Sequence, residues 1–187
     1  MDSFSYLSVV ISIVLGLGAA NLLMGLARIV QIRGRVSFYW PTIVWALTLL
    51  LIHVQTWWTM FGLRFVTHWD FVSFSITLAQ PILLFFLSAL VMPDFDRDDA
   101  LDLRRNYFQQ RRWFFAIFIA VLLVSLLRTY VLFGGLPAPA DVAFHAFFFL
   151  LVATAATSSS DGVQKIAALV AAAGMLAYIA LLFMPLR

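Results

Sequence analysis

The chain has 187 residues, of which 64% are hydrophobic and only 11% are charged. A soluble globular domain is about half apolar and about a quarter charged, so this composition excludes one and indicates an integral membrane protein. The formal net charge is +3 and there is no cysteine, which excludes disulfides and metal sites built on thiolates.

Six segments are long and apolar enough to cross about 30 Å of hydrocarbon as helices. In chain order they are Ser5–Ala27, Tyr39–Phe61, Phe71–Met92, Trp113–Phe133, Val142–Thr157 and Val163–Met184. No linker is long enough to separate domains, so residues 1–187 are expected to form a single helical membrane domain. We therefore predict an all-α, polytopic bundle of six transmembrane helices.

Small residues recur at helical spacing in the first and last of these segments. The first has Ser8, Ser12, Gly16 and Ala20, with Gly18, Asn21 and Gly25 on an adjoining face, and the last has Ala167, Ala171 and Gly174. In lipid, small residues allow helix backbones to approach closely, which favours association. These faces predict tight packing within the bundle and self-association into a homo-oligomer.

The second segment places two polar side chains, His53 and Gln55, inside hydrocarbon. At about 100° per residue they point in nearly opposite directions, so two faces of this helix need polar partners. A polar group without a partner in hydrocarbon costs on the order of several kcal/mol. We therefore expect the second helix to be surrounded by other helices and the imidazole of His53 to be neutral.

The second and third helices are antiparallel and joined by a short loop, so facing residues should have numbers summing to roughly 133. This register pairs His53 with Gln80 through a hydrogen bond and Thr56 with Thr77, while Pro81 opens the helix at the same level. Ser125 of the fourth segment lies at a similar depth. The predicted midplane polar pocket consists of His53, Thr56, Thr77, Gln80 and Ser125.

Two interpretations of this pocket are open. Its residues can simply hydrogen-bond one another and set helix register, or they can form a site for a small molecule, an ion or a proton. No acidic residue lies in the predicted membrane interior, which argues against a proton-coupled transporter. The leading hypothesis is a non-enzymatic channel, carrier-like or ligand-sensing protein whose small ligand or ion is unknown.

The long loop after the third segment begins with acids and ends with arginines. We predict a short interfacial amphipathic helix from Asp98 to Arg112, because this charge order complements the helix dipole. Within it, Asp98, Asp99 and Asp102 form "DDALD", which resembles the DDxxD magnesium motif of prenyl-diphosphate enzymes. The resemblance implies an alternative function as a membrane enzyme acting on a lipid or prenyl diphosphate, although the second acidic motif of such enzymes is absent.

Six ionisable residues are expected near one level at the other membrane boundary. This outer rim consists of Arg64, His68, Asp70, Arg128, Asp141 and His145. It is interpreted as an ion-paired boundary, or else as the mouth of a site or a metal site. His53 and His145 are also the one pair of membrane histidines that could hold a b-type haem, a further alternative. The leading hypothesis assigns no metal or cofactor.

The basic residues predict how the chain is threaded. Nine arginines and lysines lie in the connections after the first, third and fifth segments, against three on the other side. By the positive-inside rule both termini are then outside, which is the periplasm if the protein lies in a bacterial inner membrane. The positive charge therefore indicates contact with anionic lipid and no nucleic-acid partner.

This threading is testable with single cysteines, since the chain has none of its own. A cysteine placed within residues 94–112 should be shielded from a membrane-impermeant thiol reagent added to intact cells, while one at Gly135 should be labelled. The opposite labelling pattern would overturn the predicted orientation.

Overall fold

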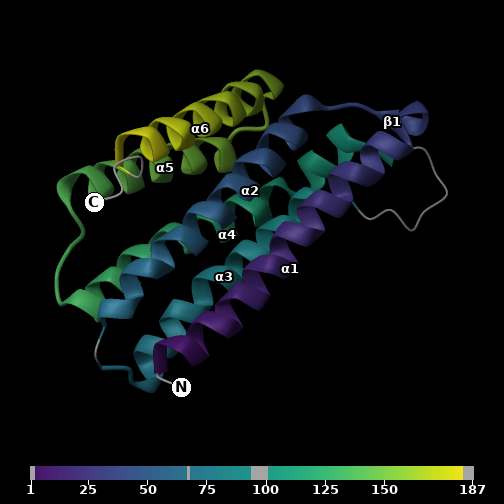
Figure 1. Ribbon diagram of the computed structural model, residues 1–187. Helices are drawn as coiled ribbons and strands as arrows, with labels where there is room; N and C mark the ends of the chain where they lie inside the picture. The colour runs from purple at the N-terminus through teal and green to yellow at the C-terminus, as the bar shows by residue number, and fades with distance from the viewer. Residues whose placement is uncertain (1–2, 67, 94–100, 183–187) are drawn as a thin grey trace.

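The computed structural model describes residues 3–66, 68–93 and 101–182 and has six helices long and apolar enough to cross a membrane (Figure 1). They are α1 (Ser3–Gln31), α2 (Trp40–Thr59), α3 (Phe71–Val91), α4 (Leu103–Phe133), α5 (Pro139–Thr157) and α6 (Asp161–Leu182). Short 3-10 helices η1 (Arg33–Arg35) and η2 (Met60–Phe65) follow α1 and α2, and strands β1 (Val36–Ser37) and β2 (Leu101–Asp102) pair in parallel. The prediction of an all-α bundle with six spanning helices is confirmed.

Helix α4 is longer than its predicted membrane segment. It runs without a break from Leu103 to Phe133, so residues 103–112 of the predicted interfacial helix form its first turns, while Leu101 and Asp102 form strand β2. One buried stripe follows the helix across this boundary: Leu103, Tyr107, Arg111, Phe114 and Phe118. Because the charged segment continues the packing face of the apolar one, the two form a single helix. Residues 98–100 lie outside the described residues.

Helix α2 lies in the middle of the molecule, in contact with α1, α3, α4 and α6 (Figure 1). Its Trp45 is fully buried, and the rings of Phe114, Phe115 and Phe118 of α4 meet it edge-on at centroid distances of 5.3 to 5.7 Å. Edge-to-face pairs of this kind contribute about 0.5–1.5 kcal/mol each beyond the area that they bury. The expectation that other helices surround α2 holds in part, because four helices contact it while Leu47, Val54 and Trp58 are exposed on its remaining face.

The two small-residue faces of α1 have different surroundings. A Cβ atom added to Gly18 would overlap the ring of His53, and Asn21 on the same face donates to Ser88 of α3 over 3.5 Å. Gly16 is exposed, and a Cβ atom added there would meet nothing. The prediction of close packing therefore holds for the Gly18 face, while the Gly16 face lies on the surface of the bundle.

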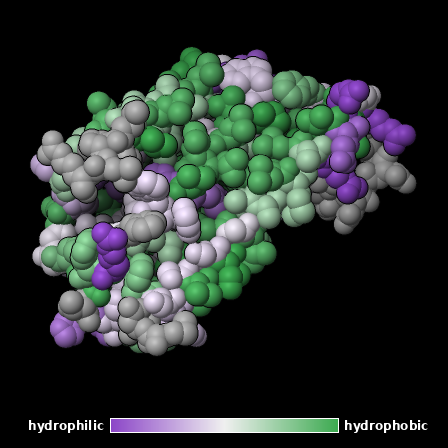
Figure 2. All heavy atoms as spheres, in the orientation of Figure 1, coloured by the Kyte–Doolittle hydropathy of each residue, from purple (hydrophilic) through white to green (hydrophobic). Residues whose placement is uncertain are grey.

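Helices α5 and α6 form a hairpin that packs on α4 and α2 (Figure 1). Ala167 and Ala171 of α6 are buried, and a Cβ atom added to Gly174 would lie 2.8 Å from the ring of Phe147. The small residues of α6 thus allow the close approach that the sequence predicts. Between the ends of the molecule, the surface is broadly hydrophobic, as a surface facing lipid must be (Figure 2).

We call the end that carries the α1–α2, α3–α4 and α5–α6 connections the arginine-rich end, and the opposite one the terminal end. At the arginine-rich end the hairpin is fixed by Gln164, which is completely buried. Tyr107 of α4 donates to its Oε1 atom at 2.8 Å, and its amide donates to Ala155 O at 2.8 Å and Ser158 O at 2.7 Å. Arg111 also donates to Ser158 O. These bonds join the α5–α6 turn to α4.

A second set of polar contacts at this end centres on Asp161, the first residue of α6. Its carboxylate accepts from Tyr39, which precedes α2, at 3.0 Å, and pairs with Arg104 at 3.4 Å and Lys165 at 2.7 Å. Burial and the adjacent carboxylate of Asp161 raise the pKa of Tyr39, so the phenol stays protonated and remains a donor. The hairpin is therefore attached to both α2 and α4 at the arginine-rich end.

Two glycines of α1 provide a matched test of this packing. Gly18→Ala should lower the free energy of unfolding by about 1–3 kcal/mol, because the added methyl group displaces His53 from its place. Gly16→Ala should leave it unchanged or raise it by up to about 1 kcal/mol, because alanine favours helix and meets nothing there. Unfolding of the purified variants measures both values, and equal responses would contradict the placement of α1.

Candidate functional site

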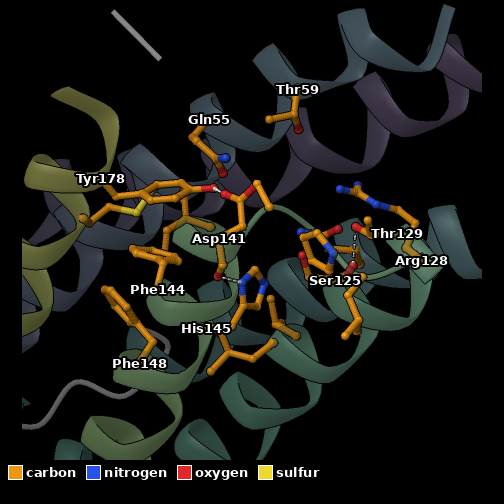
Figure 3. A pocket seen from close by; sticks show the side chains of 18 of the residues that line it. Gln55, Thr59, Ser125, Arg128, Thr129, Asp141, Phe144, His145, Phe148 and Tyr178 are labelled. Atoms are coloured by element: carbon orange, nitrogen blue, oxygen red, sulfur yellow. Dashed lines mark hydrogen bonds between the residues drawn. The ribbon is translucent and has the colours of Figure 1, made fainter. Parts of the chain in front are cut away.

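A cavity of about 450 Å³ lies between the α5–α6 hairpin and helices α2 and α4, towards the terminal end. We call it the hairpin cavity. Polar side chains reach it from every surrounding helix: Gln55, Thr59, Gln80, Ser125, Arg128, Thr129, Asp141, His145 and Tyr178 (Figure 3). Apolar rings, among them Phe118, Phe144 and Phe148, form the remainder of its wall. This mixture of apolar surface and a few polar groups is typical of ligand sites.

The connection between α4 and α5 separates the two helices at this end. Gly134 ends α4 with a φ of 69°, a left-handed conformation that glycine adopts without strain, and its N–H donates to Tyr130 O at 2.9 Å. Pro139 begins α5, where its fixed φ suits the first turn of a helix. The intervening residues Leu136, Pro137 and Ala138 line the cavity. The stretch "GGLPAP" therefore opens the space that the polar side chains enter.

Arg128 of α4 is the cation of the cavity. It is half-buried and has no hydrogen bond or ion pair with any residue that the structure describes. It points towards the cavity, with Ser125 and Thr129 beside it on the same helix (Figure 3). An ionised side chain in a membrane-spanning segment is costly unless something neutralises it, and such residues commonly mark ligand or ion sites.

The opposite wall of the cavity holds a carboxylate and an imidazole. Tyr178 of α6 donates to Asp141 Oδ1 at 2.7 Å, and Phe144 stacks on the Tyr178 ring with centroids 3.8 Å apart. His145 Nδ1 lies 2.7 Å from Asp141 O. Because a carbonyl oxygen only accepts, Nδ1 is the donor in this contact, which makes Nε2 the acceptor in the neutral form of the ring. These contacts orient both side chains from α5.

The structure divides the predicted midplane pocket between two places. Gln80 and Ser125 line the hairpin cavity, whereas His53, Thr56 and Thr77 are buried and do not line it. Thr77 donates to Ser73 O at 2.7 Å, and Thr56 Oγ1 has no partner among the described residues. The five residues therefore do not form a single site.

The predicted hydrogen bond between His53 and Gln80 is wrong. His53 Nδ1 lies 2.8 Å from Leu49 O of its own helix, and its Nε2 atom points at Gly18 of α1. Neither His53 Nε2 nor Gln80 Oε1 has a partner among the described residues. The missing side chain of Gly18 leaves room for the imidazole, so His53 faces α1, while Gln55 on the opposite face of α2 enters the cavity (Figure 3).

The predicted outer rim is also divided. Arg128, Asp141 and His145 line the hairpin cavity, whereas His68 and Asp70 line a separate hollow. Asp70 caps α3 by accepting from Ser73 N at 2.7 Å, a bond that lowers the pKa of this carboxyl group. Arg64, the remaining residue of the predicted rim, lines neither of these, and its guanidinium lies 4.6 Å from the ring centre of Phe65.

The acidic motif is only partly described. Asp98 and Asp99 lie outside the described residues, and Asp102 caps α4 by accepting from Arg105 N at 3.0 Å. No group of three His, Asp or Glu side chains suited to a metal occurs in the described ranges. The two histidines considered for haem face different parts of the bundle, since His145 lines the hairpin cavity and His53 packs against Gly18 of α1.

The cavity contains residues that the sequence-based site omits, namely Gln55, Thr59, Thr129 and Tyr178. Two of them carried a signal in the sequence. Gln55 lies inside the membrane on the face of α2 opposite His53, where a polar side chain needs a polar partner. Thr129 lies on the same helix face as Ser125 and Arg128, because Arg128 and Thr129 follow Ser125 by three and four residues. Tyr178 carried none, because an aromatic residue near a membrane boundary is ordinary.

Comparisons with protein-family models, with curated proteins and with solved structures found no match to this chain.

Two glutamines allow one substitution to be compared in two environments. Gln80→Met keeps the side-chain length and removes an amide oxygen without a partner, so stability should be unchanged or rise by about 1 kcal/mol. Gln164→Met removes three hydrogen bonds and leaves the hydroxyl of Tyr107 without its acceptor, so stability should fall by about 2–4 kcal/mol. Unfolding measurements on both variants test this, and a larger loss for Gln80→Met would restore a hydrogen-bonded role for Gln80.

Proposed function

We propose that this membrane protein is a non-enzymatic binding protein whose hairpin cavity takes a small amphipathic ligand with an acidic group. The proposal covers carrier-like and ligand-sensing roles, for which such a site is the common requirement. The observation that carries it is Arg128, a half-buried cation without an ion pair among the described residues, directed into a cavity of about 450 Å³. Volumes of about 300–1,000 Å³ are usual for small-molecule sites.

The chemistry of the wall supports an amphipathic ligand. A guanidinium presents donors in a planar fork that matches a carboxylate or a phosphate. Ser125 adds a hydroxyl on the same side of the cavity, and Phe144 and Phe148 present apolar faces on the other. An acidic group bound at Arg128 would neutralise a charge that the spanning helix otherwise carries alone.

Packing beneath the cavity favours binding over conduction through one chain. Phe118 and Phe148 line it and stack with centroids 6.3 Å apart, and Phe118 also packs against the buried Trp45. Beyond them, the buried Gln164 joins the hairpin to α4 at the arginine-rich end. A solute entering from the terminal end therefore meets a packed floor.

The membrane setting belongs to the same proposal. The described residues place eight basic side chains at or near the arginine-rich end: Arg28, Arg33, Arg35, Arg104, Arg105, Arg111, Arg112 and Lys165. By the positive-inside rule this end is cytoplasmic, so in a bacterial inner membrane the cavity lies in the periplasmic half. The exposed face around Gly16 is available for the expected homo-oligomer.

The proposal is tested by binding of octanoate and octyl phosphate to the full chain in an uncharged detergent, measured calorimetrically. Arg128→Gln should weaken binding of both probes at least tenfold, because it removes the charged donors while keeping a polar side chain. Arg64→Gln is the matched control, since Arg64 lies at the same end and does not line the cavity. It should bind both probes as the wild type does.

Equal affinity of the wild type and Arg128→Gln for both probes would contradict the proposal. A loss of equal size in Arg64→Gln would contradict it too, because the effect would then follow net charge. If Arg128→Gln does not fold, Ser125→Phe supplies the test by filling the cavity next to Arg128. Binding unaffected by that change would place the ligand elsewhere.

A further inference from the structure

Two opposite charges face the hairpin cavity without meeting. Arg128 enters from α4 and Asp141 from α5, and they form no ion pair. Figure 3 shows Arg128 with Ser125 and Thr129 on one side of the cavity, and Asp141 with Tyr178 and Gln55 on the other.

The position of the carboxylate is determined by its neighbours. The hydroxyl of Tyr178 donates a hydrogen bond to Asp141 Oδ1 at 2.7 Å, and the second carboxylate oxygen, Oδ2, can accept from another donor. Asp141 lies in the first turn of α5, where the helix dipole favours a negative charge. Tyr178 and Arg128 both line the cavity, so the phenol that orients Asp141 faces the same space as the guanidinium. The cavity thus presents an oriented carboxylate on one side and an arginine without an ion pair among the described residues on the other.

We propose that the ligand of the hairpin cavity is a zwitterion, with an acidic oxyanion bound by Arg128 and a primary ammonium bound by Asp141. This inference rests on the proposed function and specifies its ligand. Opposite charges at low dielectric that form no ion pair are each costly, and a molecule carrying the complementary pair neutralises both. Its apolar part contacts Phe144 and Phe148, the rings that line the cavity near Asp141.

The acceptors around Asp141 favour a primary ammonium over a quaternary one. A primary ammonium has three N–H donors. Three side chains that line the cavity carry acceptors for such donors: Asp141 Oδ2, His145 Nε2 and the amide oxygen of Gln55. A quaternary ammonium has no donor, and it would leave these three groups without hydrogen bonds.

This chemistry has two natural sources. One is the phosphoethanolamine headgroup of a phospholipid, and the other is a free amino acid with an apolar side chain. Each has an oxyanion, a primary ammonium and an apolar part. The experiment therefore uses short-chain phospholipids and phenylalanine analogues as separate arms.

The probes are dihexanoyl phosphatidylethanolamine and L-phenylalanine, each compared with molecules that lack one feature. Dihexanoyl phosphatidic acid and phenylpropionate lack the ammonium, and dihexanoyl phosphatidylcholine carries a quaternary one. Binding to the full chain in an uncharged detergent is measured calorimetrically. One primary-ammonium probe should bind at least tenfold more tightly than its own counterparts, and the arm in which this occurs identifies the source.

Asp141→Asn is the decisive variant, because asparagine keeps an acceptor for Tyr178 and removes the charge. It should abolish the preference for the primary-ammonium probe and leave the affinity for the probe without ammonium within about twofold of the wild type. Arg128→Gln should instead weaken both. If Asp141→Asn does not fold, His145→Phe removes a neighbouring acceptor and should reduce the same preference.

Three results overturn the inference in distinguishable ways. If acidic probes with and without ammonium bind equally and Arg128→Gln weakens both, the ligand is a simple anion and the proposed function stands. If no acidic probe responds to Arg128→Gln, both the inference and the proposed function fail. Selective binding of the primary-ammonium probe that survives in Asp141→Asn also overturns the inference, because Asp141 would not be its partner.

Discussion

The attachment of the α5–α6 turn to α4 through Gln164 is the constraint on which the rest of the structure depends. The carboxamide of Gln164 is completely buried, its oxygen accepts one hydrogen bond and its amide group donates two. Breaking any of these bonds would leave a buried polar group without a partner, so they fix the position of the turn closely. They hold the hairpin against α4 at one end only. At the other end the glycines and prolines after Phe133 separate α4 from α5, and the hairpin cavity lies between them.

Helix α2 gives the bundle two polar interiors of different character. On one face, His53 fills the space left by Gly18 and bonds within its own helix, a closed and structural environment. On the other face, Gln55 enters a cavity with charged walls. The same helix therefore contributes to packing and to a site, and the difference lies in its neighbours: α1 approaches closely, whereas the hairpin diverges.

Arg128 and Asp141 lower the stability of the bundle, because each places a charge in a half-buried position without an ion pair among the described residues. Apolar residues of similar volume would serve a purely structural bundle at least as well, because ion pairs in low dielectric seldom repay their desolvation. Here the two charges are not even paired with each other. The proposed zwitterionic ligand would complete both charges.

The sequence by itself determined the class, the six spanning helices and the opposite directions of His53 and Gln55, since hydrophobic length and helical period are local properties. It also identified Arg128, Asp141, His145, Gln80 and Ser125, but in two separate groups that included His53 and His68. Only the tertiary structure decided which of these meet. The register between helices depends on the close approach at Gly18 and on the divergence of the hairpin, and both follow from contacts between segments far apart in the chain.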